Sequence, residues 1–192
     1  VLQEINTRVF ADPDLLDANL RAISSAFRVH YPEATFVHPV TSPGGATQYR
    51  HPASGRYFRI FPFVTNTVSH DTVTDAATAF EAARQFGLFA RRLDYLPIEA
   101  IRPSIPRFHD LDLRVAQFER SLGEGNRDRI AACAGLIARA RAYMGIADAY
   151  RAALASGALR ARLMHHDTKI SNVLFDARSG KGVCVVDLDT VM

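Results

Sequence analysis

The chain has 192 residues, with 23 basic against 20 acidic residues and a net charge of +3. This length allows one domain or two small lobes, and an apolar fraction of 48% is ample for a core. The net charge is small and the basic residues are scattered, so the composition does not indicate nucleic acid or an anionic membrane as a partner. No run approaches about 20 apolar residues, which excludes a membrane-spanning helix.

The two cysteines, Cys133 and Cys184, lie in apolar surroundings. A buried free thiol behaves as a small hydrophobic residue, so we expect both side chains to be buried and unpaired. Their spacing favours neither a disulfide nor a metal site. With no recognisable signal peptide, this cysteine usage indicates the reducing cytoplasm.

The first part of the chain predicts a strand followed by a long helix. Residues 1–5 form the expected strand. Asp12 and Pro13 are a helix start signal, with Asp12 as the N-cap and Pro13 in the first turn. Apolar residues then recur at helical spacing until Pro32 ends the run.

Two further strands are expected at residues 36–40 and 55–64. In the second, alternation puts one set of side chains on a single face: Tyr57, Arg59 and Phe61. Pro62 cannot donate a ladder hydrogen bond, which suits a hinge between two lobes. The alternative for this stretch is an ordinary core strand.

The middle of the chain predicts helices. Residues 75–96 carry an apolar stripe at helical spacing, formed by Phe80, Ala83, Phe86, Ala90 and Leu93. A loop rich in proline separates this helix from two more, expected over residues 113–122 and from residue 128 to about residue 156. Gly157 ends the last of them.

The polar segment that follows carries the chemistry. It matches the pattern His-x-Asp-x-Lys-x-x-Asn of a kinase catalytic loop through His165, Asp167, Lys169 and Asn172. Asp187 follows an apolar run and is a second acidic site. Phosphoryl transfer needs a carboxylate at the acceptor hydroxyl, a nearby cation, and an Asn and an Asp that hold magnesium. The sequence therefore predicts phosphoryl transfer.

The flanking segments distinguish this motif from a chance cluster of turn-forming residues. Residues 173–175 and 183–186 read as strands, and residues 176–182 between them read as a turn. Because hairpin partners lie opposite each other, we expect Asn172 and Asp187 to come together.

The sequence resembles the aminoglycoside phosphotransferase and choline kinase superfamily, and within it the bacterial N-acetylhexosamine 1-kinases. The resemblance runs nearly end to end and is carried by three blocks: Val1–Phe10, Ile105–Asp110, and an ending made of His166–Asp176 with Val186–Met192. It implies an α+β, protein-kinase-like fold in what we expect to be a fragment. Residues 1–64 would form a partial N-lobe sheet and hinge, and residues 65–192 a mostly helical C-lobe with the catalytic loop and the magnesium-binding strand end.

The N-lobe departs from the general kinase pattern. There is no Gly-rich phosphate loop. Gln3 occupies the position of the strand lysine, and the following helix offers Asp17 or Asn19 where a glutamate is expected. The usual Lys–Glu ion pair is therefore in doubt.

The resemblance implies an enzyme that uses ATP and Mg²⁺ to phosphorylate a small molecule, namely the anomeric hydroxyl of an N-acetylhexosamine. Asp167 would act as base and Lys169 would neutralise charge on the transferring group. Magnesium would bind Asn172 and Asp187, with Asp189 supporting the metal or the substrate. Adenine would meet the hinge at Phe61, Phe63 and Val64.

Some assignments stay open on sequence alone. His109 and Asp110 are candidates for sugar contact, or Asp110 simply caps the next helix. One rival function is an amino-alcohol or aminoglycoside kinase, although the acidic residues form no cluster for a cationic acceptor. The other is a nucleotide-binding pseudokinase, which the missing lysine favours and the intact catalytic motif disfavours.

Overall fold

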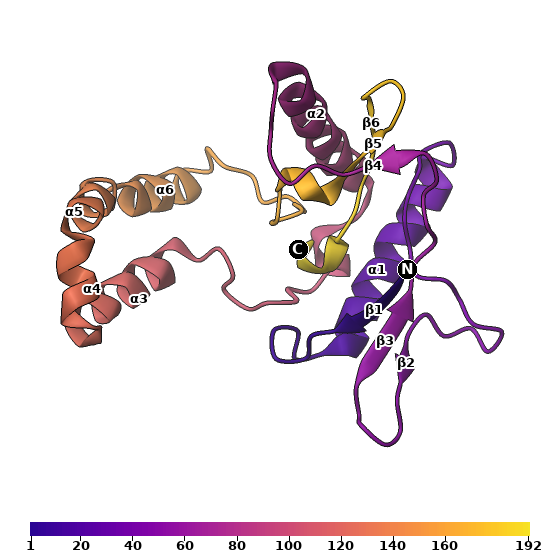
Figure 1. Ribbon diagram of the computed structural model, residues 1–192, viewed down its shortest axis with the longest axis horizontal. Helices are drawn as coiled ribbons and strands as arrows, with labels where there is room; N and C mark the ends of the chain where they lie inside the picture. Colours follow the sequence, from indigo (N-terminus) through magenta and orange to yellow (C-terminus); the bar gives the residue numbers. More distant parts are fainter. The chain divides into compact units, whose positions relative to one another are not determined.

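The computed structural model describes residues 1–192, and they divide into two compact units (Figure 1). Unit 1 comprises Val1–Pro106 and Arg162–Met192, and unit 2 comprises Arg107–Ala161. The lobe boundary expected at residue 64 lies inside unit 1 and stays a prediction. None of the helices has the length and apolar character needed to cross a membrane.

The first sheet of unit 1 has three antiparallel strands in the order β1-β3-β2, formed by β1 (Leu2–Ile5), β2 (Tyr49–Arg50) and β3 (Tyr57–Ile60). Gln3 of β1 lies opposite Arg59 of β3. The expected strand at residues 55–64 is thus confirmed in its central part, and β3 ends before Pro62 as the missing donor requires.

The strand expected over residues 36–40 is wrong. This segment is irregular and meets β3 through one hydrogen bond, from the N–H of Val40 to the carbonyl oxygen of Ile60 at 2.7 Å. Pro39 has no N–H to extend a ladder, and β2 pairs with β3 instead.

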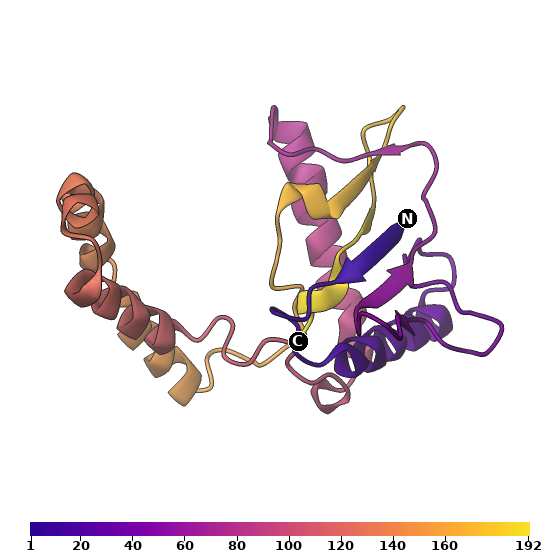
Figure 2. The ribbon, with the colours of Figure 1, turned by 60° about the horizontal axis from the view of Figure 1, so that its bottom comes forward.

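Helix α1 (Pro13–His30) begins where the sequence indicates, and lies beside the first sheet (Figure 2). The N–H of Leu15 donates to the Asp12 carboxylate at 2.9 Å, which satisfies one of the free N–H groups of the first turn. The helix ends before Pro32 and buries one face, formed by Leu16, Asn19, Leu20, Ile23 and Phe27.

Helix α2 (Ala76–Arg92) is capped by Asp75 and continues into the short helices η1 (Leu93–Tyr95) and η2 (Ile98–Ala100). The expected apolar stripe is wrong at Phe80, which is 64% exposed, and at Ala83, which is also exposed. Two polar side chains of α2 are buried instead. Glu81 accepts hydrogen bonds from Lys181 and Gly182, and Gln85 donates to the Gly182 carbonyl. These bonds to the hairpin fix the rotation of the helix.

The second sheet has the order β4-β5-β6, with β4 (Thr67–Val68), β5 (Val173–Asp176) and β6 (Gly182–Val185). Strands β5 and β6 form the predicted hairpin. The main core of unit 1 gathers apolar residues from α1, α2, η1 and the C-terminal segment: Leu20, Ile23, Phe27, Phe89, Leu93, Ile101, Leu163, Val185, Leu188 and Val191.

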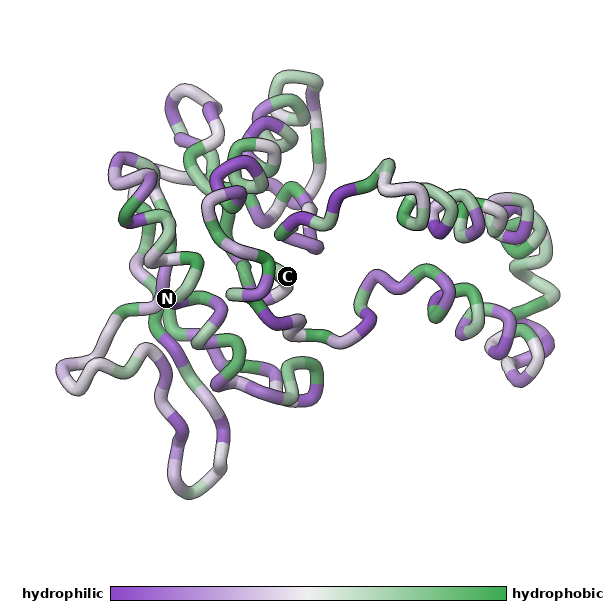
Figure 3. Tube along the Cα trace, turned by 180° about the vertical axis from the view of Figure 1, so that it is seen from behind, coloured by the Kyte–Doolittle hydropathy of each residue, from purple (hydrophilic) through white to green (hydrophobic).

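Unit 2 consists of helices α3 (Leu111–Glu124), α4 (Arg127–Ala132), α5 (Ala134–Ala142) and α6 (Ile146–Ala155). The single helix expected over residues 128–156 is broken at Cys133 and again before α6, where Gly145 lowers helix propensity. Along these helices apolar and polar residues alternate (Figure 3).

The cysteines differ in their surroundings. Cys184 of β6 is a buried free thiol as expected, and burial raises the pKa of this thiol to about 11. The expected burial of Cys133 is wrong, because the thiol lies exposed at the junction of two short helices of unit 2.

Candidate active site

The catalytic-loop segment runs from His165 to the short helix η3 (Ile170–Asn172) in unit 1. His165 is 2% exposed and packs edge-on against Phe86 and Phe89 of α2. Its Nδ1 accepts the N–H of Asp167 at 3.2 Å, and its Nε2 lies 2.9 Å from the carbonyl oxygen of Val186. These contacts assign the neutral tautomer with the proton on Nε2.

The environment of His165 favours this uncharged form. Loss of water on burial lowers the pKa of the imidazole, outweighing the bond to Val186 and the charge of Asp167. A neutral, enclosed ring that holds two backbone segments supports the loop. It does not serve as a proton carrier.

Asp167 lies at the centre of a polar cluster. Its Oδ2 atom is 2.8 Å from Lys169 Nζ and accepts a hydrogen bond from Asn172 Nδ2 at 3.0 Å. The hydrogen bond from Lys169 is the main cause that lowers the pKa of Asp167, and the same bond raises the pKa of Lys169. Asp167 is therefore ionised at neutral pH.

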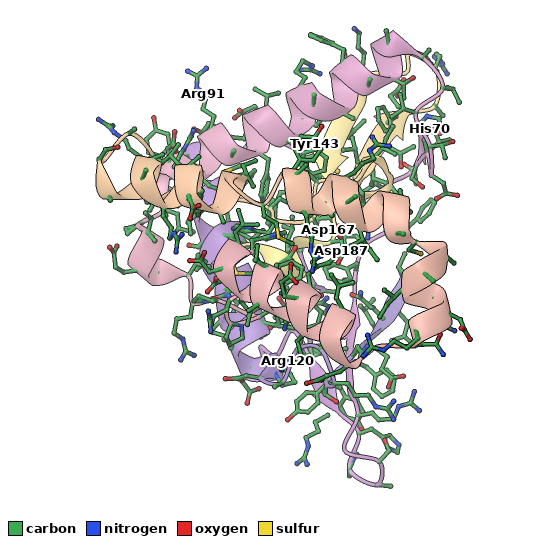
Figure 4. The ribbon with its side chains drawn as sticks, turned by 90° about the vertical axis from the view of Figure 1, so that its left-hand side faces the viewer. His70, Arg91, Arg120, Tyr143, Asp167 and Asp187 are labelled. Carbon is green, nitrogen blue, oxygen red and sulfur yellow. The ribbon has the colours of Figure 1, made fainter.

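The hairpin brings the second acidic position beside this cluster. The N–H of Val186 donates to the carbonyl oxygen of Asn172 at 2.9 Å, so Asp187 follows directly after this cross-strand link. Asp167 and Asp187 lie close together (Figure 4). This hydrogen bond between Val186 and Asn172 brings Asn172 and Asp187 near each other, as predicted.

The surroundings of Asp187 disfavour the ionised form of its carboxyl group. Loss of water around the carboxyl group, followed by the negative charge of Asp189, raises the pKa of Asp187, although the residue as a whole still reaches solvent. Its backbone is left-handed, with φ of 61°, as is that of His166 with φ of 62°. Such conformations are uncommon outside glycine and cluster at functional sites.

A cavity of about 420 Å³ opens beside Asp187 within unit 1. Its lining includes the three residues that the sequence assigns to adenine binding, Phe61, Phe63 and Val64. The lining also includes residues of β1 and of the segment after β6. The volume and the largely apolar walls suit a planar heterocyclic ligand.

Arg59 joins this cavity to the C-terminal segment. The side chain is 5% exposed, and its Nε donates to Gln3 Oε1 at 2.9 Å. Its Nη2 forms a buried ion pair with Asp189, which is 6% exposed and lies in the short helix η4 (Leu188–Thr190). The expected role of Asp189 at metal or substrate stays a prediction, and one of its oxygens pairs with Arg59.

Asp17 and Asn19 of α1 are the candidates for the position of the kinase glutamate, and neither pairs with a residue of β1. Asp17 binds Arg21 and the hydroxyl of Thr47. Asn19 is buried and bonds both backbone groups of Arg102, at 2.7 and 3.2 Å. The Lys–Glu pair of the general kinase pattern is therefore replaced at both ends.

His109 and Asp110 belong to unit 2. Asp110 caps α3 by accepting the N–H of Leu113 at 2.9 Å and pairs with Arg107, which lowers the pKa of the carboxyl. The capping alternative is confirmed. Both residues also line a cavity of about 390 Å³ within unit 2, together with Asp112, Tyr150, Arg151 and others. Sugar contact stays a prediction.

Sequence reasoning missed the part played by Arg59. It placed the residue on one strand face with Phe61 without giving it a role. A usable signal was present, since a cation inside an otherwise apolar strand must find a partner when buried. The acidic partner, 130 positions later, could not be identified from spacing.

Two comparisons relate this geometry to known proteins. The sequence matches the model of the phosphotransferase enzyme family, APH, over residues 32–192. The structure is similar to the crystal structure of the AMP-bound complex of spectinomycin phosphotransferase, APH(9)-Ia, with a TM-score of 0.61 and 12% identity. The match covers all of this chain and 58% of that one. At this identity it establishes the fold alone, and the expected α+β, kinase-like fold is confirmed.

Proposed function

Because the chain belongs to the phosphotransferase enzyme family, we propose that it transfers the γ-phosphoryl group of ATP to a hydroxyl group of a small molecule. The observation that carries this proposal is the cluster of Asp167, Lys169 and Asn172 beside Asp187, at the edge of a cavity of about 420 Å³. Phosphoryl transfer depends on positioning and on charge stabilisation, and these groups supply both.

The acceptor hydroxyl would lie against Asp167. Its oxygen attacks the γ-phosphorus as the bond from that phosphorus to the bridging oxygen of ADP breaks, and its proton passes to the Asp167 carboxylate. Lys169 and Asn172 occupy Oδ2, which leaves Oδ1 for the acceptor. With its pKa lowered, Asp167 would orient the hydroxyl in the ground state and receive the proton late in the step.

Asn172 and Asp187 are the residues that would hold Mg²⁺. Their oxygens suit this hard cation, and burial followed by the negative charge of Asp189 raises the pKa of Asp187, an effect that a bound cation would oppose. No group of three or more carboxylate, imidazole or thiol side chains is placed to hold a metal. This fits Mg²⁺, which is usually bound by one or two carboxylates together with phosphates and water. When bound, it neutralises charge developing on the phosphate oxygens.

The nucleotide would occupy the cavity beside Asp187, with adenine at Phe61, Phe63 and Val64. AMP is the ligand named for the similar spectinomycin phosphotransferase structure, which supports a nucleotide as the ligand class here. The lining around these residues is mainly apolar, as a purine ring requires.

For the acceptor, we propose a neutral sugar, the anomeric hydroxyl of an N-acetylhexosamine. The resemblance of the Ile105–Asp110 block supports this class. In the unit 2 cavity, Asp110 pairs with Arg107, and Asp112 lies 3.6 Å from Arg151. Arginines offset both carboxylates, so these two residues give no reason to expect a polycationic acceptor.

The test is a screen for ADP release with ATP, Mg²⁺ and one acceptor at a time. The acceptors are N-acetylglucosamine, N-acetylgalactosamine, choline, spectinomycin and kanamycin. We expect turnover with an N-acetylhexosamine and a phosphorylated anomeric carbon by ³¹P NMR. Preference for choline or an aminoglycoside would overturn the sugar assignment and leave the phosphotransferase class intact. ATP binding without turnover of any acceptor would favour a non-catalytic nucleotide-binding protein.

A further inference from the structure

We propose that Arg59 binds the phosphates of the nucleotide and takes the place of the strand lysine that position 3 lacks, with Asp189 as its positioning residue. This inference rests on the proposed function, since it concerns the same nucleotide cavity. It gives Asp189 a role different from metal coordination. It also assigns the cationic part of the site to the hinge-side strand β3.

The register of the first sheet supports the exchange. Gln3 and Arg59 are Cα partners on β1 and β3, and the Gln3 side chain accepts a hydrogen bond from Arg59 Nε at 2.9 Å. The positive charge that a lysine at position 3 of β1 would carry is thus supplied by Arg59, its cross-strand partner on β3. Both residues line the cavity together with Asp187.

No other arginine or lysine lines that cavity. The chain contains two lysines, and each is engaged elsewhere: Lys169 with Asp167 and Lys181 with Glu81. A nucleotide in this cavity would bring several negative charges, so a cation at Arg59 answers a requirement that no other lining side chain meets.

The orientation of the guanidinium group is fixed from three sides. Nε bonds Gln3, Nη2 pairs with Asp189, and the group lies 4.9 Å from the centre of the Phe61 ring. These two bonds use two of the five N–H donors of arginine, and the remaining donors are available to phosphate oxygens. Holding the group in advance reduces the entropy lost when a ligand binds.

The ion pair is also incompletely satisfied. Asp189 Oδ1 is buried and has no hydrogen-bond partner. A buried carboxylate oxygen without a partner is uncommon in a finished core, where nearly all such atoms are bonded. Asp189 does not line the cavity itself, but its partner Arg59 does, so the unpaired oxygen indicates a group whose surroundings are completed when a ligand and its associated water arrive.

The experiment measures affinities of the full chain for adenosine, AMP, ADP and ATP by calorimetry, with Mg²⁺ present. Arg59→Met keeps the length of the side chain and removes the charge. We expect about 10- to 100-fold weaker binding of ADP and ATP, the range of a charge-assisted hydrogen bond. Adenosine affinity should change less than about threefold, because the ring lies at the hinge. Arg59→Lys should recover part of the loss.

Arg56→Met is the matched control. Arg56 also reaches from the β3 side to β1, where it pairs with Glu4, but it is exposed and does not line the cavity. Its replacement should leave all four affinities unchanged.

A merely structural role is tested by the double variant Arg59→Met/Asp189→Asn. Loss of one partner from a buried ion pair destabilises a protein strongly, whereas loss of both can be nearly neutral. We expect the double variant to recover the melting temperature lost in Arg59→Met and still to bind ADP weakly. Recovery of both the melting temperature and the ADP affinity in the double variant would overturn the proposal. An equal loss of affinity for adenosine and ADP in Arg59→Met would also overturn it.

The proposal and the proposed function fail in different ways. If the unaltered chain binds no adenine nucleotide, the proposed function fails with it. If the unaltered chain binds ATP and Arg59→Met binds it equally well, only the assignment of Arg59 is wrong.

Discussion

The two units of this protein are built in different ways. All the buried hydrophobic residues except Ala147 lie in unit 1, and unit 2 arranges four helices around very little enclosed surface. Several large side chains in α5, in α6 and in the turn between them are more than 60% exposed, namely Leu136, Ile146 and Tyr143. The candidate catalytic residues all lie in unit 1, on backbone fixed by that core.

This contrast teaches where rigidity is available for chemistry. Asp167 and Asp187 are held by His165, which α2 packs in place, and by a hairpin that contacts the same helix. In unit 2, the ion pairs Arg141–Glu119 and Arg151–Asp148 are exposed. Exposed pairs contribute little to stability. Substitutions should therefore have large effects in unit 1 and small effects in unit 2.

The largest effect is expected at Asp167. Asp167→Asn keeps the shape and removes the base, so the rate of phosphoryl transfer should fall by about 10²–10⁴-fold. Affinity for Mg-ATP should survive, because the nucleotide cavity is unchanged. The same replacement in unit 2, Asp128→Asn, changes an exposed carboxylate of α4 and should leave the rate unaltered. Steady-state ADP release measures both.

Asp187→Asn should fail in a different way. A neutral amide is a poorer ligand for a hard cation, so titration with Mg-ATP should give weaker binding. If Asp167→Asn loses the nucleotide and Asp187→Asn retains it, the two roles are reversed.

A second comparison concerns the cores. Phe175 of β5 is 1% exposed, and Phe175→Ala should lower the free energy of unfolding by about 3–5 kcal/mol through lost burial and a cavity. Leu136 of α5 is 67% exposed, and Leu136→Ala should change the free energy of unfolding by less than about 0.5 kcal/mol. Urea unfolding of both variants measures the difference. Equal losses would mean that unit 2 has a core that its exposed side chains do not reveal.

The smallest of these effects concerns acid stability. Hydrogen bonds from Lys181 and then Arg84 lower the pKa of Glu81 to about 2, against an ordinary value of 4.5. Because the folded-state pKa is depressed, this stabilisation is present above pH 4.5 and is lost as pH falls towards 2. Glu81→Gln should therefore melt below the wild type at pH 6, and the gap should close by about pH 2.

Glu119→Gln is the matched variant in unit 2. Its pair with Arg141 also lowers the pKa of Glu119, but both side chains are exposed. The melting temperature should respond less to this replacement at every pH. A larger response than that of Glu81→Gln would contradict the contrast between the units.

Much of the fold followed from local signals. The capping of α1 by Asp12 and the hairpin after the catalytic loop were predictable because the residues that specify them are close together in the chain. The buried face of α2 was not, because it depends on hydrogen bonds that Glu81 accepts from, and Gln85 donates to, a hairpin about 100 residues away. Neither was the exposure of Cys133, which reflects how little unit 2 encloses.

The site divides in the same manner. Asp167, Lys169 and Asn172 form a local motif, and the structure brings them together as expected. The ion pair between Arg59 and Asp189 joins two segments that the sequence separates widely, and only the assembled sheets reveal it. The local catalytic motif could be predicted from the sequence, but the pairing of Arg59 with Asp189 could not.

The left-handed backbone at Asp187 has a consequence for thermal stability. Residues with a Cβ lose about 1–2 kcal/mol in this conformation relative to glycine, so Asp187→Gly should melt at a higher temperature than Asp187→Ala even though both lack the carboxylate. If Asp187 holds magnesium as proposed, its carboxylate is gained at a cost in thermal stability that a single backbone angle sets.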